Sequence, residues 1–366
     1  MMDHSWRDSS ILDIHEKVLA GERLSKEDGI RLYHSDDLLQ IGYMANILRS
    51  RMHGKNAYFV CNRHINPTNI CVNRCRICAF SRDPGDEDAY LMKIDEIIEL
   101  VRRDLAHGIR EVHIVGGLHP EVGVDYYTNL IREIKNTAPH LFVKALTPVE
   151  IDHIARVSGI DPERALELLK DAGIDSLAGG GAEIFSERCR LIGWEKKISG
   201  RRWLDITRAA HRLGIRSNAT MLYGHVETKE ERVDHLIRLR ELQDETGGFQ
   251  AFIPLPFHPE GTSIGHKRCG GVDDLKTIAI SRLILDNFPH IKAYWIGLGV
   301  KTAQVALSFG ADDLDGTIVE ERIFHAAGAE SRAGMERGEL ISLIKEAGFV
   351  PLERDGAYRL IGSGGR

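Results

Sequence analysis

Short apolar runs alternate along the chain with longer segments in which apolar residues recur at helical spacing. Between positions 94 and 105 one helix face is apolar, through Ile94, Ile97, Ile98, Val101 and Leu105. Gly108 ends this pattern, and the β-branched run 111–116 that follows is typical of a strand. Further helix starts are predicted at Asp161-Pro162 and at Thr228, which has the spacing of a capping box with Glu231.

Six more runs have a strand-like composition, and helical patterns separate most of them. They are Val60–Asn66, Leu141–Leu146, Ile174–Ala178, Ser217–Leu222, Phe249–Pro254 and Lys292–Ile296. Regular alternation of strands and helices predicts an α/β protein with a parallel sheet. Seven or eight such units favour a (β/α)8 TIM-type barrel, although the pattern alone leaves a doubly wound open sheet possible.

The two ends of the chain are predicted to add elements to this central barrel. Helical patterns at 11–19 and 38–52 predict an N-terminal helical cap over residues 1–59. The barrel is predicted to span residues 60–331, and residues 332–366 to form an extension of one helix and one short strand packed on it. No Pro/Gly/Ser-rich linker divides the chain, so one catalytic domain is the simplest interpretation.

The charge pattern argues against nucleic acid as a partner. The 366 residues carry a formal net charge of −6, with no long block of one sign. The first residues lack the basic start and apolar run of a secretory signal, and no apolar stretch reaches membrane-spanning length. We therefore expect a cytoplasmic protein that binds neither nucleic acid nor membrane.

Three of the six cysteines lie within eight residues. Cys71, Cys75 and Cys78 form a C-x3-C-x2-C loop after the first predicted barrel strand, where barrel enzymes place active-site loops. Three thiolates can hold three irons of a [4Fe–4S] cluster and leave the fourth iron open to another ligand. The alternative is a zinc site, which would need a fourth ligand such as Cys61 or His64 from the strand. The spacing favours an iron–sulfur cluster.

This cysteine loop, which ends in an aromatic residue at Phe80, resembles the signature of the radical S-adenosylmethionine (SAM) superfamily. The resemblance implies that the open iron binds SAM and that reductive cleavage of SAM gives a 5′-deoxyadenosyl radical. It also implies an electron donor such as a flavodoxin or ferredoxin.

A closer resemblance, to the aminofutalosine synthase family of the futalosine route to menaquinone, covers most of the chain. The segments that carry it are Arg63–Phe80, Glu111–Pro120, Gly179–Phe185, Ser217–His225 and Asp244–Pro259. The resemblance implies a transferase that adds the adenosyl radical to 3-[(1-carboxyvinyl)oxy]benzoate. The implied product is 6-amino-6-deoxyfutalosine, formed with loss of the carboxylate as bicarbonate.

Two kinds of alternative remain open. Sibling radical SAM enzymes, such as cyclic dehypoxanthinyl futalosine synthase or the deazaflavin-forming synthase, share the cluster motif. A different class would be an iron–sulfur electron carrier or a zinc-stabilised binding protein. A carrier needs no open iron, so three clustered cysteines rather than four argue against it.

Candidate site residues follow from the same resemblance and from polar positions on the later strands. Those for SAM are Phe80, Gly116, Gly117, Glu183, Arg188 and Arg190. Those for the substrate are His119, Asn218, Thr220, Tyr223, Gln250 and His258. In place of the acidic residue that often follows the glycines, this chain has Leu118-His119. Plainer interpretations are a simple turn for the glycines, a solvated helix face for the arginines and ordinary hydrogen bonding for the histidines.

Overall fold

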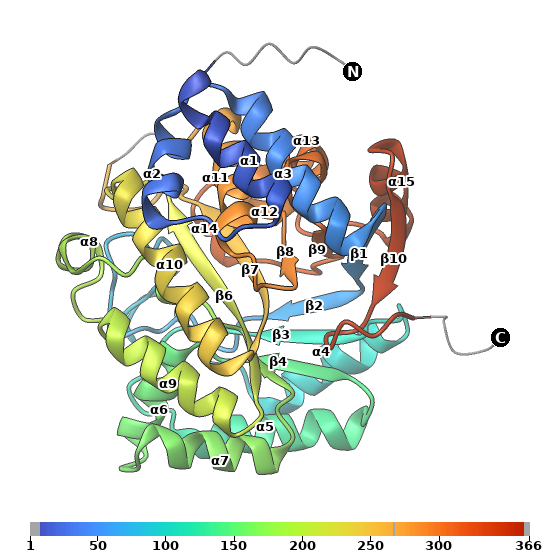
Figure 1. Ribbon diagram of the computed structural model, residues 1–366. Coiled ribbons are helices and arrows are strands. Elements are labelled where there is room, and N and C mark those ends of the chain that lie inside the picture. The colour runs from blue at the N-terminus through green and yellow to red at the C-terminus, as the bar shows by residue number, and fades with distance from the viewer. Residues whose placement is uncertain (1–7, 266–267, 362–366) are drawn as a thin grey trace.

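A curled, seven-stranded parallel sheet forms the centre of the molecule (Figure 1). The computed structural model describes residues 8–265 and 268–361. The sheet runs in chain order through β2 (Asn62–Ile65), β3 (Glu111–Ile114), β4 (Phe142–Ala145), β5 (Ser176–Leu177), β6 (Arg216–Tyr223), β7 (Phe249–Pro256) and β8 (His290–Ile291). Six of the seven predicted strand positions are confirmed by these bounds, and so is the predicted parallel α/β architecture.

The eighth place of the barrel is filled differently from the other seven. Strands β1 (Asn56–Val60), β9 (Asp313–Gly316) and β10 (Val350–Arg354) form a separate parallel sheet in the order β10-β1-β9. Single parallel bridges join Lys292 to Asp313 and Arg63 to Val319, so the segment around β9 lies between the two ends of the large sheet. The sheet is therefore a half-barrel whose gap is spanned by isolated bridges.

Helices cover the outer face of the curled sheet (Figure 1). They are α4 (Ile94–Leu105), α5 (Val124–Thr137), α6 (Pro148–Val157), α7 (Pro162–Ala172), α9 (Gly200–Arg212), α10 (Lys229–Thr246) and α11 (Gly271–Ile284). Local sequence explains several of their starts: Asp161 caps α7 with Pro162 at the first helical position, and Thr228 and Glu231 form a capping box on α10. Both predicted helix starts are confirmed.

Shorter helices occupy the connections at the later strands. They are α8 (Glu187–Gly193), α12 (Trp295–Leu298), α13 (Val300–Ala306), η2 (Leu307–Phe309) and α14 (Ile323–Ala326). The predicted strand Lys292–Ile296 is wrong, because the ladder residues are His290–Ile291 and Trp295 begins a helix. This apolar run is buried on all sides, and burial of that kind does not distinguish a short strand from a short helix.

The N-terminal helices pack against the outer helical layer. They are η1 (Ser9–Ile11), α1 (Leu12–Ala20), α2 (Lys26–His34) and α3 (Leu38–His53), of which α1 and α3 were predicted. Helix α3 lies on α11, and α2 lies on α10 and α11. At Gly29 of α2, a Cβ atom would lie 3.0 Å from side-chain atoms of both Val233 and Ile284. A glycine, unfavourable within a helix, thus allows this close approach.

The C-terminal segment comes back to the amino-terminal ends of the strands. Helix α15 (Arg337–Glu346) leads into β10, which pairs with β1 in parallel. Arg354 then forms an ion pair with buried Asp313 at 2.6 Å, and the Tyr358 ring stacks on His290 with centroids 3.7 Å apart. This end of the barrel is therefore closed by the chain itself.

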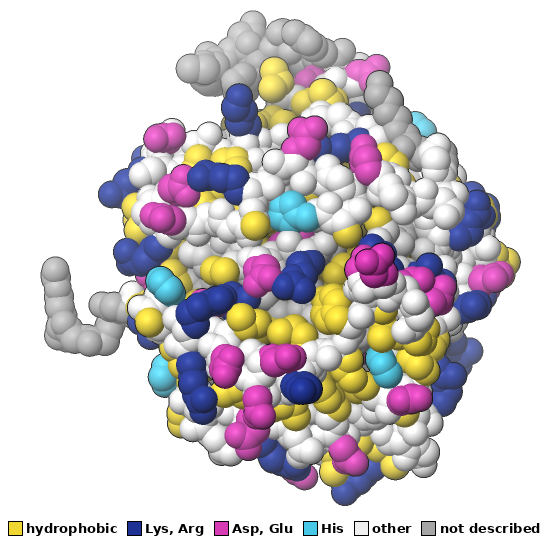
Figure 2. Space-filling view, turned by 180° about the vertical axis from the view of Figure 1, so that it is seen from behind, with side chains coloured by type: hydrophobic (Ala, Val, Ile, Leu, Met, Phe, Trp, Pro, Cys, Tyr) yellow, Lys and Arg dark blue, Asp and Glu magenta, His cyan; other side chains and the backbone are white. Residues whose placement is uncertain are grey.

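The surface carries charges of both signs. On the face shown in Figure 2, basic and acidic side chains are interspersed rather than gathered into one patch. Among the residues that the structure describes, no helix combines the length and apolar character needed to cross a membrane.

Candidate active site

A cavity of about 320 Å³ opens at the carboxyl-terminal ends of the strands, between the loops that follow them. Its wall includes the three clustered cysteines, the glycines after β3 and β5, and apolar side chains of β6 and β7. In parallel α/β barrels this end of the sheet is where active sites lie. The cavity therefore joins the predicted cluster loop to the barrel lumen.

Backbone hydrogen bonds fix the cysteine loop on the end of β3. The Val72 N–H donates to the carbonyl of Leu118 at 3.0 Å, and the Gly117 N–H donates to the carbonyl of Thr68 at 2.8 Å. Within the loop, the Cys71 N–H donates to the carbonyl of Arg82 at 3.0 Å. All three thiols of the motif consequently face one cavity from a single, tied loop.

Glycine is required where β3 meets this loop. A Cβ atom at Gly117 would lie 2.2 Å from the carbonyl oxygen of Ile70, and one at Gly116 would lie 3.0 Å from that of Thr68. Backbone atoms cannot move aside as a flexible side chain does, so these glycines allow the cysteine loop to pack closely. Their predicted contact with the methionine end of SAM stays a prediction.

The spacing of the thiols fits a cluster better than a single metal ion. Sulfurs around one tetrahedral zinc ion lie about 3.8 Å apart, given a Zn–S distance of about 2.3 Å. Cys71, Cys75 and Cys78 do not form a set of ligand atoms all within 4.8 Å of one another. Burial raises the pKa of Cys75 to about 12, a penalty that binding of a positively charged iron would offset.

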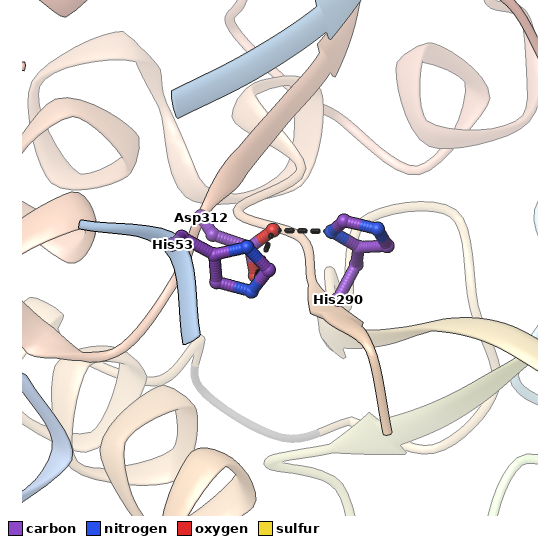
Figure 3. Close-up of side chains that lie close together, drawn as sticks. All are labelled: His53, His290 and Asp312. Atoms are coloured by element: carbon purple, nitrogen blue, oxygen red, sulfur yellow. Dashed lines mark hydrogen bonds and ion pairs between the residues drawn. The ribbon is translucent and has the colours of Figure 1, made fainter. Parts of the chain in front are cut away.

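Within the described part of the chain, one group of side chains has ligand atoms close enough together to hold a single metal ion, and it lies at the opposite end of the barrel. His53, His290 and Asp312 place their ligand atoms within 4.8 Å of one another (Figure 3). The Asp312 carboxylate already pairs with Arg282, which supplies a positive charge, and accepts hydrogen bonds from the ring of His290 at 2.6 Å and the Ile291 N–H at 2.8 Å. This group is explained as a structural ion-pair network.

A partly buried ion pair lies beside the cysteines. Glu183, in the left-handed region with φ of 55°, pairs with Lys197, and each side chain is 15% exposed. Burial disfavours the charge on Lys197, but Glu183, Cys75 and Cys78 together raise the Lys197 pKa above its ordinary value. Lys197 therefore holds a positive charge next to the thiols.

The structure brings part of the predicted site together. The predicted residues that line the cavity are Cys71, Cys75, Cys78, Phe80, Gly116, Gly117, Glu183, Thr220 and His258. The predicted residues that do not line it are His119, Arg188, Arg190, Asn218, Tyr223 and Gln250.

Both arginines of helix α8 are engaged away from the cavity. Arg188 makes two hydrogen bonds to Glu231, of 3.0 and 2.6 Å, and a third to the carbonyl of Val226 at 2.7 Å. Arg190 pairs with Glu187 on its own helix, with a bond of 2.8 Å from its Nε. The geometry gives neither guanidinium a place against a methionine carboxylate.

Strand alternation separates the predicted residues of β6. Thr220 lines the cavity, whereas Tyr223, three positions later, points to the opposite face and donates to Asp274 of α11 at 2.7 Å. Asn218 is 1% exposed, and neither of its amide atoms has a hydrogen-bond partner among the described residues.

The remaining predicted residues make ordinary main-chain contacts. Gln250 donates to the carbonyl of Gly356 at 3.2 Å, near the closed end of the barrel. The carbonyl of His119 accepts a hydrogen bond from the His153 ring at 2.8 Å. The Nδ1 of the His119 ring accepts one from the Glu121 N–H at 3.2 Å. His258 lines the cavity while its Nε2 contacts the carbonyl of Gly297 at 2.9 Å.

Several polar residues that line the cavity were not predicted as cofactor or substrate contacts, among them His64, His113, Glu150 and Lys197. Polar residues at alternate positions of a buried strand, as at 62 and 64 or 111 and 113, are a signal for a lumen-facing row. Glu150 has capping-box spacing from Thr147, which marks it as a helix-start residue but does not place it in a cavity. No local signal marks Lys197.

Comparison with known proteins identifies two family regions in the chain. Residues 65–239 match the model of the radical SAM superfamily, and residues 246–363 match the CofH/MqnC C-terminal region. The first match contains the cysteine loop, and the second contains β7 through β10.

Curated relatives are similar over nearly the full chain. Aminodeoxyfutalosine synthase of Thermus thermophilus is 47% identical over 358 residues, with 96% of each chain covered. The 5-amino-6-(D-ribitylamino)uracil–L-tyrosine 4-hydroxyphenyl transferase of Methanoculleus marisnigri is 41% identical, with 95% of this chain and 97% of the relative covered. Cyclic dehypoxanthine futalosine synthase of Halalkalibacterium halodurans is 38% identical, with 96% and 95% covered.

A solved structure supports the fold. The FeFe-hydrogenase maturase HydG from Carboxydothermus hydrogenoformans superposes with a TM-score of 0.73 at 16% identity, covering 96% of this chain and 81% of that protein. At this identity the similarity concerns the architecture alone.

Proposed function

Because this chain belongs to the radical SAM superfamily, within the group that includes the aminodeoxyfutalosine synthases, we propose that it is an enzyme with that activity. The observation that carries the proposal is the 47% identity to the Thermus thermophilus enzyme, against 41% and 38% to relatives with two sibling activities. The proposed reaction combines SAM, 3-[(1-carboxyvinyl)oxy]benzoate and water. It yields 6-amino-6-deoxyfutalosine, methionine and bicarbonate.

The cysteine loop supports this chemistry through its three cavity-facing thiols. A [4Fe–4S] cluster bound there would supply the electron that cleaves SAM to the 5′-deoxyadenosyl radical, which then adds to the enolpyruvyl methylene. Cys71, Cys75 and Cys78 would each hold one iron. Lys197, partly buried beside Cys75 and Cys78, would offset the negative charge that the thiolates bring into the cavity.

The lumen supports radical addition because its wall is mostly apolar. Leu118, Leu222, Ile253 and Leu255 line the cavity. Such a wall excludes water and holds the two reacting carbons close together. A cavity of about 320 Å³ is within the range of small-molecule sites.

The sibling activities are the alternative. The relatives at 41% and 38% identity also cover almost the whole chain, so the reaction has to be tested by product analysis. We further propose an electron donor of the flavodoxin or ferredoxin type and a reducing, cytoplasmic setting, which suits free thiols and a reducible cluster.

The deciding experiment follows the fate of the adenosyl group. The protein is reconstituted anaerobically with iron and sulfide, reduced, and given 3-[(1-carboxyvinyl)oxy]benzoate with SAM deuterated at the 5′ carbon. We expect a nucleoside adduct that retains both deuterons, with little free 5′-deoxyadenosine. Stoichiometric 5′-deoxyadenosine without an adduct would contradict the proposal. Parallel reactions with dehypoxanthine futalosine, and with L-tyrosine plus 5-amino-6-(D-ribitylamino)uracil, test the two siblings.

A further inference from the structure

Two histidines stand side by side on the floor of the cavity. His64 of β2 and His113 of β3 are direct partners in the parallel ladder, and their rings stack with centroids 4.6 Å apart and planes inclined by 21°. Tyr294 lies nearly parallel to the His64 ring, with centroids 6.4 Å apart. All three side chains line the cavity. His64, His113 and Tyr294 thus form a layer of aromatic rings at the bottom of the cavity, called the aromatic shelf below, and the two histidines bring ring nitrogens to it.

This shelf has an uncommitted polar atom. His64 is 9% exposed, and its Nε2 is buried without a hydrogen-bond partner among the described residues. A buried polar atom left in this condition is unfavourable. Since the ring faces the cavity, a ligand that enters the cavity can satisfy this atom.

The charged groups around the shelf have partners elsewhere, although one carboxylate oxygen of Glu111 has no hydrogen-bond partner among the described residues. Glu111 pairs with Lys144 at 2.7 Å, and Asp315 pairs with Lys292 at 2.9 Å. Glu321 accepts hydrogen bonds from the main-chain N–H groups of Ile323 and Phe324 at 2.8 and 2.9 Å, at the start of α14, and also contacts His325.

Because the neighbouring lysines are paired and the free oxygen of Glu111 can only accept, the imidazoles are the donors left for an anionic ligand. Burial lowers the pKa of both histidines, so each free ring is neutral and offers one N–H donor. Two parallel rings 4.6 Å apart are spaced so that each can donate to one oxygen of the same carboxylate, at ordinary hydrogen-bond distances.

Resting on the proposed function, we propose that His64 and His113 bind the ring carboxylate of the benzoate substrate and so determine specificity. His113 lies three residues before Gly116, which places the shelf up to about 10 Å deeper than the glycine turn at about 3.3 Å per residue. The enolpyruvyl end must meet SAM near the cysteine loop. The aromatic ring then extends into the lumen, and its carboxylate reaches the shelf.

The test compares two ligands in the reconstituted holoenzyme without reductant, so that no turnover occurs. One is 3-[(1-carboxyvinyl)oxy]benzoate, and the other is 2-phenoxyacrylate, which lacks only the ring carboxylate. Their dissociation constants are measured by isothermal titration. Two hydrogen bonds to a carboxylate should make the wild-type protein bind the benzoate about 10- to 100-fold more tightly. Equal affinities in the wild type would overturn the proposal.

Variants locate the preference. In the double variant His64→Leu/His113→Leu the ratio of the two affinities should fall to about one, while 2-phenoxyacrylate itself still binds. His113→Asn keeps an N–H donor and should retain part of the ratio. Equal weakening of both ligands, or an unchanged ratio, would assign the histidines a merely structural role. If the double variant does not fold, the affinity ratio is measured in the single variants His64→Gln and His113→Asn and compared with that of the wild type. A ratio unchanged in both would overturn the proposal.

This outcome is separable from that of the proposed function. The affinity ratio reports the ring-carboxylate subsite in unreduced protein, whereas the deuterium experiment reports the reaction. Loss of the ratio in the variants together with absence of the adduct would support the subsite and reject the reaction. Formation of the adduct by a protein that binds the two ligands equally tightly would support the reaction and reject the subsite.

Discussion

The carboxylate of Glu150, in the first turn of α6, accepts a hydrogen bond from the main-chain N–H of Gly116 at 2.9 Å. Its other oxygen accepts one from the Thr147 N–H at 2.7 Å. The side chain is 2% exposed, and burial outweighs these hydrogen bonds and raises the Glu150 pKa to about 7. A capping residue thereby links the turn after β3 to the helix after β4.

This link predicts a pH dependence of stability. The folded state holds the Glu150 proton up to about pH 7, whereas an unfolded chain releases it near the ordinary value of 4.5. The contribution of this group to the free energy of unfolding is therefore present below pH 4.5 and is lost as the pH rises to 7. We expect a loss on the order of 2–3 kcal/mol.

Urea unfolding of the wild type and Glu150→Gln at pH 5 and 7.5 measures this contribution. The stability of the wild type relative to the variant should fall between the two values. Glu163→Gln, at an exposed position in the first turn of α7, is the matched control. A pH-independent difference between wild type and Glu150→Gln would mean that Glu150 is ionised throughout.

The three motif cysteines should be individually essential for the cluster. Cys71→Ser, Cys75→Ser or Cys78→Ser should each reduce bound iron after anaerobic reconstitution to a small fraction of the wild-type amount and abolish SAM cleavage. The physical reason is that two thiolates cannot retain a cubane with one open iron. Cys61→Ala, Cys189→Ala and Cys269→Ala should keep the iron. Loss of iron on changing Cys61 alone would show a misassigned ligand.

Gly117→Ala should disturb the cysteine loop itself. The new Cβ would lie 2.2 Å from the carbonyl oxygen of Ile70, which precedes Cys71, so the loop must shift. We expect iron content after reconstitution to fall at least twofold, and SAM affinity to weaken with it. Gly180→Ala is the control, since its Cβ would meet no atom closer than 3.5 Å. Normal iron content in Gly117→Ala would refute the packing argument.

Lys197→Met should make the cluster harder to reduce. The variant removes a partly buried positive charge beside Cys75 and Cys78 and leaves Glu183 without its ion-pair partner. Both changes disfavour an added electron, so the midpoint potential should fall by on the order of tens of millivolts. Potentiometric titration monitored by electron paramagnetic resonance measures it. The exposed neighbour Lys196, changed to Met, should leave the potential unaltered, and an equal shift in both variants would contradict the local effect.

Signals that lie within a few neighbouring residues were readable from the sequence. The spacing of Cys71, Cys75 and Cys78, the caps at Asp161 and Thr228, and the alternation of strands and helices all depend on neighbours in the chain. These local patterns were sufficient to predict the parallel architecture and the cluster loop. They failed at Trp295, where a fully buried apolar run gave no periodicity to interpret.

Which side chains face the cavity depends on the tertiary structure. Strand alternation states that Thr220 and Tyr223 point to opposite faces, but only the curled sheet shows that Thr220 faces the lumen. The ion pair of Arg188 with Glu231 joins residues 43 positions apart, so no local signal indicates that this guanidinium has a partner away from the cavity. His64 and His113 become a pair only through the register of two strands almost fifty residues apart. Such relations depend on which distant segments fold together, and no local spacing encodes that.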